Sequence, residues 1–158
     1  MCSGRPHHRR TSTSGLLRFL GFRVYDIRLW IGAAAVGSDW DRAATTTPLA
    51  LEIEYARGLV GAQIAERSLT EMRRQGEIAA ADADRWLAAM TQIFPDVAPG
   101  DRITGVHQPG QGARFFVNGG PRRQVAEADF SRRFFGIWLA PQTSEPALRS
   151  SLLGTGAS

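Results

Sequence analysis

Hydrophobic and polar residues alternate from residue 49 to residue 57. Four apolar or aromatic side chains share one face of this stretch: Leu49, Leu51, Ile53 and Tyr55. A period of two is typical of a half-buried β-strand, so the sequence predicts a strand with this face toward the core. The earlier stretch 16–31 is rich in aromatic and β-branched residues and predicts strands, with Gly21 at a bend or bulge.

The spacing of apolar residues then changes to that of helices. The first predicted helix covers Gly61–Gln75 and is closed by Gly76. The second covers Ala80–Phe94 and is stopped by Pro95. Between the first strands and these helices, the segment Asp39–Pro48 is predicted to be a loop.

Three short strands are predicted next, over residues 101–107, 112–118 and 123–126, with glycine-rich turns between them. Helical segments at 128–139 and 145–153 end the chain. Clustered strands joined by short turns favour a mainly antiparallel sheet with the helices packed on one face. The predicted class is therefore α+β, with a ligand pocket expected between the two layers.

The chain of 158 residues suits a single domain, which we place at residues 15–154. Residues 1–14 are rich in Ser, Thr, His and Arg and are predicted to be a disordered basic tail, and 155–158 a flexible C-terminus. The tail has no apolar segment of the kind found in secretory signals. The compartment stays open: cytoplasmic as written, periplasmic if a signal sequence precedes this start.

Charge and composition exclude several classes of function. The formal net charge is +4, but Arg5, Arg9 and Arg10 supply three of those charges, so the domain is nearly neutral and no nucleic-acid partner is expected. No apolar run is long enough for a membrane span. The chain has no lysine, which excludes Schiff-base chemistry, and its single cysteine, Cys2, supports neither a disulfide nor a metal site. No metal ligand set and no cofactor motif is recognised.

Several blocks of sequence resemble the bacterial branch of the chalcone isomerase-like family. They are residues 18–30 (RFLGFRVYDIRLW), 51–57 (LEIEYAR), 68–76 (SLTEMRRQG), 94–102 (FPDVAPGDR), 130–139 (FSRRFFGIWL) and 148–154 (LRSSLLG). The resemblance as a whole extends over about residues 15–154. The resemblance implies an open-faced β-sandwich of the α+β class, in agreement with the pattern above.

The resemblance also implies a known chemistry, which this sequence does not match. Plant members of the family close a chalcone to a flavanone, using an Arg, a Tyr, an Asn and Thr residues. The positions that correspond to the Tyr and the Asn fall near Val60 and Arg67, and those of the two Thr near Leu20 and Ile137. Because an apolar side chain cannot donate a hydrogen bond to an enolate, no catalytic residue is predicted.

Other members of the superfamily are fatty-acid-binding proteins in which an Arg and a Tyr hold the carboxylate. Here Arg18 with Tyr25 or Tyr55 could do so, since a guanidinium binds a carboxylate through two charge-assisted hydrogen bonds. The alternative interpretation makes both tyrosines core residues and Arg18 a surface charge. His107 is predicted to be structural, since no Ser or Cys is visibly paired with it along the sequence. The aromatic residues Trp30, Trp138, Phe134 and Phe135 are predicted to be core residues.

Three functions therefore remain open. The first is non-catalytic binding of a small amphipathic ligand, such as a fatty acid or an aromatic acid, in a pocket between sheet and helices. The second is an intramolecular lyase or isomerase that acts on an unsaturated carbonyl compound with a changed set of catalytic residues. The third is a structural or interaction domain. The sequence does not determine the oligomeric state.

Overall fold

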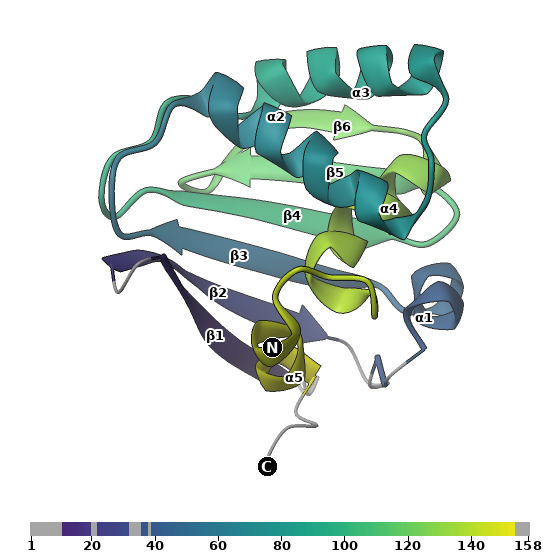
Figure 1. Ribbon diagram of the computed structural model, residues 1–158, viewed down its shortest axis with the longest axis horizontal. Helices are drawn as coiled ribbons and strands as arrows, with labels where there is room; N and C mark the ends of the chain where they lie inside the picture. Colours follow the sequence, from purple (N-terminus) through teal and green to yellow (C-terminus); the bar gives the residue numbers. More distant parts are fainter. Residues whose placement is uncertain (1–10, 20–21, 32–35, 38, 154–158) are drawn as a thin grey trace, which may run out of the picture.

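Six strands form one antiparallel sheet in which neighbours along the chain are neighbours in space (Figure 1). The computed structural model describes residues 11–19, 22–31, 36–37 and 39–153, without the side chains of residues 11–23 and 31. The strands are β1 (Thr11–Phe19), β2 (Phe22–Ile31), β3 (Leu49–Tyr55), β4 (Arg102–Gln108), β5 (Gly112–Val117) and β6 (Gly120–Val125). The predicted antiparallel sheet is thus confirmed.

The helices cover one face of this sheet, as Figure 1 shows. They are α1 (Trp40–Thr46), α2 (Gly61–Met72), α3 (Ala80–Ile93), α4 (Ala128–Leu139) and α5 (Pro146–Leu153), with the 3₁₀ turn η2 (Arg73–Gln75) after α2. The pair α2–α3 is inserted between β3 and β4, α4 packs on β4 and β5, and α5 packs on β1. This arrangement is the α+β class that the sequence predicts.

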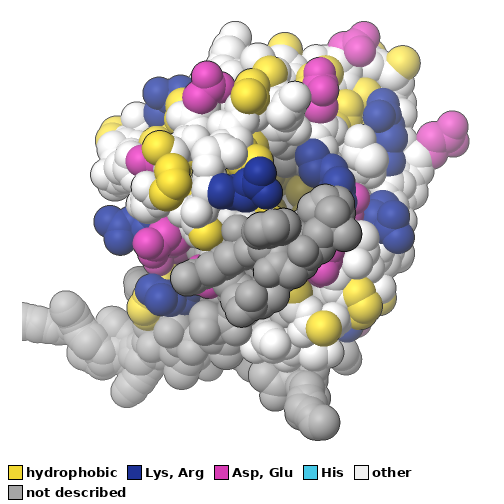
Figure 2. All heavy atoms as spheres, turned by 60° about the vertical axis from the view of Figure 1, so that its left-hand side comes forward, with side chains coloured by type: hydrophobic (Ala, Val, Ile, Leu, Met, Phe, Trp, Pro, Cys, Tyr) yellow, Lys and Arg dark blue, Asp and Glu magenta, His cyan; other side chains and the backbone are white. Residues whose placement is uncertain are grey.

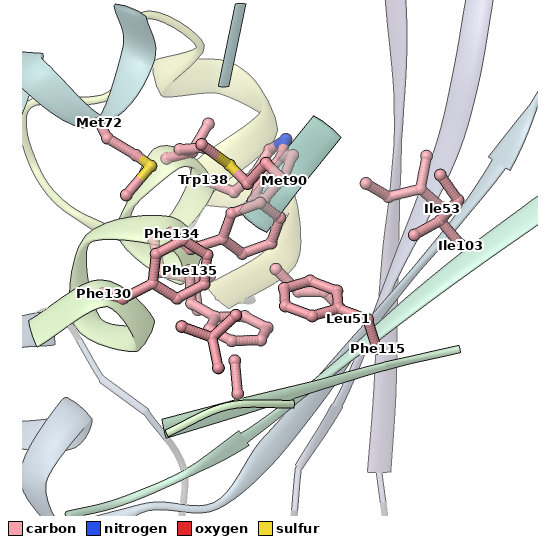
Figure 3. Packing of buried hydrophobic residues seen from close by; sticks show 14 of the residues in the cluster. Leu51, Ile53, Met72, Met90, Ile103, Phe115, Phe130, Phe134, Phe135 and Trp138 are labelled. Carbon is pink, nitrogen blue, oxygen red and sulfur yellow. The ribbon is translucent and has the colours of Figure 1, made fainter. Parts of the chain in front are cut away.

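The core lies between the helices and the sheet. Its centre is aromatic: Phe130, Phe134 and Phe135 of α4 pack around Phe115 of β5 (Figure 3). The ring centroids of Phe115 and Phe134 are 5.1 Å apart in an edge-to-face arrangement. Such pairs stabilise a core beyond the burial of their area alone. The aromatic cluster therefore fixes α4 over the β4–β5 side of the sheet.

The prediction of a loop over Asp39–Pro48 was wrong, because residues 40–46 form α1. The side chain of Asp39 caps this helix by accepting a hydrogen bond from the backbone N–H of Arg42. Trp40 is buried, and its indole N–H donates to the carbonyl oxygen of Arg132 in α4 at 2.9 Å. The helix ends in Thr residues, which have low helix propensity. The burial of Trp40, rather than local propensity, therefore makes this segment helical.

Strand β1 begins at Thr11, inside the segment 1–14 that composition assigns to a tail; residues 1–10 and 154–158 lie outside the described part. Pairing with β2 runs from Thr11 opposite Ile31 to Phe19 opposite Phe22. Any residue except proline can form backbone hydrogen bonds to a neighbouring strand. A high content of Ser and Thr therefore does not exclude a strand, although it gives no signal for one.

The face of the sheet that the helices leave free carries mixed charges. Arg28 and Arg102 both lie 3.7 Å from the carboxylate of Glu52 on this face. Trp30, predicted to be a core residue, is half-buried on the same face, since β2 buries Ile27 and Leu29 on the other. Figure 2 views a neighbouring side and shows Arg and acidic side chains interspersed rather than separated by sign.

Among the described helices, none has the length and apolarity that crossing a bilayer requires.

Candidate ligand-binding site

Two tyrosines, the only ones in the chain, lie side by side on the covered face of the sheet. Tyr25 of β2 is the cross-strand partner of Tyr55 of β3. Their rings are 5.9 Å apart between centroids and 78° apart in plane, an edge-to-face pair. The period of two that places Leu51 and Ile53 in the core also directs Tyr55 there, as the sequence predicts.

The hydroxyl of Tyr25 already accepts one hydrogen bond. The indole N–H of Trp138, in the last turn of α4, donates to it at 2.9 Å. Because an indole N–H can only donate, the phenolic O–H of Tyr25 is left to donate elsewhere. Among the described residues, none forms a hydrogen bond with the hydroxyl of Tyr55. The pair thus presents two hydroxyls that can serve as donors.

Burial keeps both phenols in their protonated form. Loss of solvation raises the pKa of Tyr25 to about 12, although the hydrogen bond from Trp138 acts in the opposite direction. Burial raises the pKa of Tyr55 further above its ordinary value, with a smaller contribution from Tyr25. Near neutral pH the site therefore offers hydrogen-bond donors and no phenolate, which suits binding an anion rather than abstracting a proton.

Arg18, the third predicted site residue, lies in β1 next to the position that faces Tyr25. Leu17 pairs with Tyr25, and Arg18 pairs with Arg23. The register shifts between Leu17 and Arg18, so the pairing of β1 with β2 is irregular beside Arg18. The side chain of Arg18 is outside the described part of the chain. Strand β2, which carries Tyr25, thus lies between β1, which carries Arg18, and β3, which carries Tyr55.

Sequence reasoning did not identify the acidic group near the tyrosines, Glu71 of α2. Its side chain is 10% exposed and lies 3.2 Å from the guanidinium of Arg67, one turn earlier. The hydroxyl of Ser144, in the segment between α4 and α5, donates to its other oxygen at 2.5 Å. The i,i+4 spacing of Arg67 and Glu71 indicates an ordinary surface ion pair, so only the folded chain reveals this buried carboxylate.

His107 is buried and holds three elements together, in agreement with the structural role predicted for it. Its Nε2 donates to the carbonyl oxygen of Ala44 in α1 at 2.8 Å, which leaves Nδ1 to accept from the hydroxyl of Ser131 in α4 at 2.6 Å. The pairing with Ser131 was not visible in the sequence, because two residues 24 positions apart leave no spacing signal. Burial lowers the pKa of His107, so its ring is neutral. Ser131 is fully buried, so its hydroxyl cannot reach a substrate, and this excludes Ser131 as a nucleophile activated by His107.

The comparison with known proteins agrees with the fold. The family model described as chalcone isomerase-like matches residues 14–154. The chain belongs to the chalcone isomerase-like family. An uncharacterised protein of Haemophilus influenzae is 31% identical over 107 residues, which is 68% of this chain and 52% of the relative. The chain thus spans about half the length of this relative.

A solved structure shares the chalcone isomerase-like fold. The crystal structure of a fatty-acid binding protein of Arabidopsis thaliana has a TM-score of 0.70, with 91% of this chain and 86% of that chain covered. The sequence identity is 13%, so the similarity concerns the fold alone.

The positions at which the family's plant enzymes carry catalytic groups hold different residues here. Val60 precedes α2 and is 47% exposed, and Ile137 is buried in α4. Arg67 is 71% exposed and paired with Glu71. Leu20 lies outside the described residues. At the three described positions the side chains have neither a hydroxyl nor an amide group. Within the described part of the chain, no group of three or more His, Cys, Asp or Glu residues could hold a metal ion.

Proposed function

We propose that this chalcone isomerase-like protein binds a small amphipathic carboxylic acid, such as a fatty acid or an aromatic acid, without transforming it. The carboxylate is held by Arg18, Tyr25 and Tyr55. The observation that carries the proposal is the pair of protonated phenols on neighbouring strands, Tyr55 buried and Tyr25 partly buried. The oxygen of Tyr25 is occupied by Trp138, and its proton is free to donate.

The three groups match the geometry that a carboxylate needs. A carboxylate has two oxygens and about four acceptor sites, so it can take two hydrogen bonds from a guanidinium and one from each phenol. Hydrogen bonds to a charged partner are worth about 1.5–3 kcal/mol each, more than those between neutral groups. The raised pKa values keep the phenols in the donating form over the physiological range.

The surroundings of the tyrosines suit an apolar chain. Ile27 of β2 and Ile53 of β3 lie on the same buried face as the tyrosines, and α5 covers β1 with Leu148 and Leu152 turned inward. The aromatic cluster of α4 occupies the β4–β5 side of the sheet, so the apolar part of the ligand would lie on the β1–β3 side. The binding activity named for the Arabidopsis protein, which has the same fold, supports this class of ligand.

The alternative is an intramolecular lyase or isomerase that acts on an unsaturated carbonyl compound. Such a reaction needs donors at the developing enolate, and Val60 and Ile137 supply none at two of the positions used in the plant enzymes. Tyr25 and Tyr55 could serve as donors to an enolate instead. This alternative therefore predicts turnover that depends on the tyrosines, which makes it an outcome of the test below.

Native mass spectrometry of protein purified from bacteria tests the proposal. The wild-type protein is expected to carry a carboxylic acid, identified after extraction, and Arg18→Ala is expected to lose it. Arg28→Ala is the matched control: it removes the same charge from β2, but Arg28 is half exposed on the opposite face and lies near Glu52. A ligand-free wild-type spectrum, or equal loss in both variants, would contradict the proposal. Formation of flavanone from a 2′-hydroxychalcone above the uncatalysed rate would support the alternative.

A further inference from the structure

We propose that the uncovered face of the sheet is a homodimer interface, on which a second copy of this chain docks face to face through strands β2 to β5. This face lies on the opposite side of the sheet from Tyr25 and Tyr55, so the proposal is independent of the ligand site. It assigns a partner to a surface that the proposed function leaves unused.

The side chains of this face form three rows that cross the strands. Helices cover only the other face (Figure 1), where Ile27, Leu51 and Phe115 are buried, so every second residue of each strand lies here. The cross-strand pairing gives a first row of Trp30, Ala50, Val106 and Arg114, a second of Arg28, Glu52, Thr104 and Phe116, and a third of Glu54 and Arg102. All of them remain at least partly exposed, so a partner can bury aromatic, apolar and charged groups together.

The two halves of this face differ in net charge. Among the described side chains, the half on β2 and β3 carries three carboxylates and one guanidinium, from Asp26, Glu52, Glu54 and Arg28. The half on β4 and β5 carries no carboxylate and two guanidiniums, from Arg102 and Arg114. One face thus contains both an acidic and a basic half, which is what a second copy of the same chain can complement.

The ion pairs within the chain do not exhaust these charges. Arg28 and Arg102 both lie 3.7 Å from the carboxylate of Glu52. Within the described part of the chain, Glu54 has no ion pair, and Arg114 has only its contact with the ring of Phe116 at 5.9 Å from the centroid. Glu54 and Arg114 are therefore available for contacts with a partner.

A twofold axis parallel to the strands, midway between β3 and β4, brings the unlike halves together. Sheets that pack face to face lie about 10 Å apart, with their strands within about 30° of each other. This axis sets β3 over β4 of the second copy and β2 over its β5, with the rows aligned. Glu54 then faces Arg102 of the second copy. Because Glu54 and Arg102 are also cross-strand partners within one chain, the dimer contains a square of four alternating charges.

The first row supplies apolar and aromatic contacts across the same axis. Trp30 of β2 faces Arg114 of the second copy, and a guanidinium is attracted to the face of an indole ring. Ala50 faces Val106 of the second copy, so the contact nearest the axis in this row is apolar. Each of these contacts occurs twice, as in any isologous interface.

The charges exclude the neighbouring positions of the axis. An axis over β3 would set Glu54 against its own copy, and an axis over β4 would do the same with Arg102. Juxtaposed like charges oppose association and thereby fix the register of an interface. The position between β3 and β4 avoids both conflicts.

Sedimentation velocity of the full chain over a range of concentrations tests the dimer. The wild-type dimer is expected to dissociate as NaCl is added, because salt screens exposed charges. Glu54→Arg makes all four charges of the square positive, and Arg102→Glu makes all four negative. Either change alone should raise the dissociation constant of the dimer by at least about a hundredfold.

Mixing the two variants separates loss of the interface from loss of folding. In an equimolar mixture, the positive pair of one chain meets the negative pair of the other, so a heterodimer should form although neither variant dimerises alone. A variant with both changes should form a homodimer again. Glu66→Arg is the matched control, since it reverses an exposed charge on α2, on the other side of the sheet, and should leave the dissociation constant unchanged.

Three results would overturn the proposal. A wild-type chain that stays monomeric at the highest concentration would show that something other than a second copy occupies this face. A dimer that Glu54→Arg and Glu66→Arg weaken equally would place the interface elsewhere. Failure of the mixed variants to associate would contradict the facing of Glu54 and Arg102 across the axis.

Discussion

Tyr25 and Tyr55 show how loss of solvation can keep a phenol in its protonated, hydrogen-bond-donating form. A phenol has an ordinary pKa near 10, and removal of water from the phenolate raises that value. The structure adds the Trp138 indole N–H, which occupies the Tyr25 oxygen and leaves its proton to donate. Two protonated donors on adjacent strands are therefore a feature of the fold itself.

Spectrophotometric titration reads these two residues directly, because they are the only tyrosines in the chain. The folded protein is expected to show no tyrosinate absorbance at pH 10, where exposed phenols are half ionised, and Tyr25 should ionise only at about pH 12. In denaturant both should titrate at their ordinary value. Since the folded pKa is the higher one, their contribution to stability is full below pH 10 and is lost as the pH rises through the folded values. Ionisation of either phenol in the folded protein at about pH 10 would contradict their burial.

The resemblance to fatty-acid-binding members of the superfamily pointed to the two tyrosines, and the strand pattern directed Tyr55 to the core. The sequence did not identify Glu71 or Ser131. Their partners, Ser144 and His107, lie 73 and 24 residues away along the chain, and contacts at such separations leave no periodic signal. Local patterns determine which face a side chain occupies, whereas long-range packing determines which polar groups meet there.

Among the elements, the strands β2 to β6 and the helices α2 to α5 could be predicted, from an apolar period in β3, α2 and α3 and from composition or flanking turns in most of the others. Helix α1 could not, since it has seven residues, ends in threonines and is held by the buried Trp40. Isolated helices of this length are unstable in water, so tertiary contacts decide whether they form. The packing of α2 against the end of α3 also depends on a close contact between two backbone segments, which the sequence does not show.

That close approach is at Gly61, the first residue of α2. A Cβ atom there would lie 2.6 Å from the carbonyl carbon of Pro95, and it would also contact the carbonyl oxygen of Phe94. The backbone N–H of Gly61 donates to the side chain of Asp96 at 2.8 Å, so neither segment can move aside freely. Gly61→Ala should therefore lower the free energy of unfolding by about 3 kcal/mol.

Gly58→Ala is the control for this change, because a Cβ atom at Gly58 would have its nearest contact at an ordinary 3.4 Å from the carbonyl oxygen of Val97. It should cost less than about 1 kcal/mol. Urea unfolding of both variants gives the comparison. Equal stability of the two would show that the start of α2 is not packed against the end of α3 as the structure has it.

At the level of the whole molecule, the chain is a six-stranded sheet with helices on one face, and the family match over residues 14–154 covers nearly all of it. The two sides of the covered face differ. Over β4 and β5 the aromatic cluster of α4 fills the space, and over β1 to β3 the tyrosines, Trp138 and the inward side of α5 meet. One side is filled by aromatic rings, and the other carries the polar groups on which the proposed ligand site depends.

The most direct test of this account is a double-mutant cycle on octanoate affinity, with Arg18→Ala, Tyr25→Phe and the double variant. If Arg18 and Tyr25 hold the same carboxylate, each single change should weaken binding at least about tenfold. The double variant should then differ from the sum of the two by more than about 0.5 kcal/mol. Additive effects, or unchanged affinity in either single variant, would contradict the claim that the two residues form one carboxylate site.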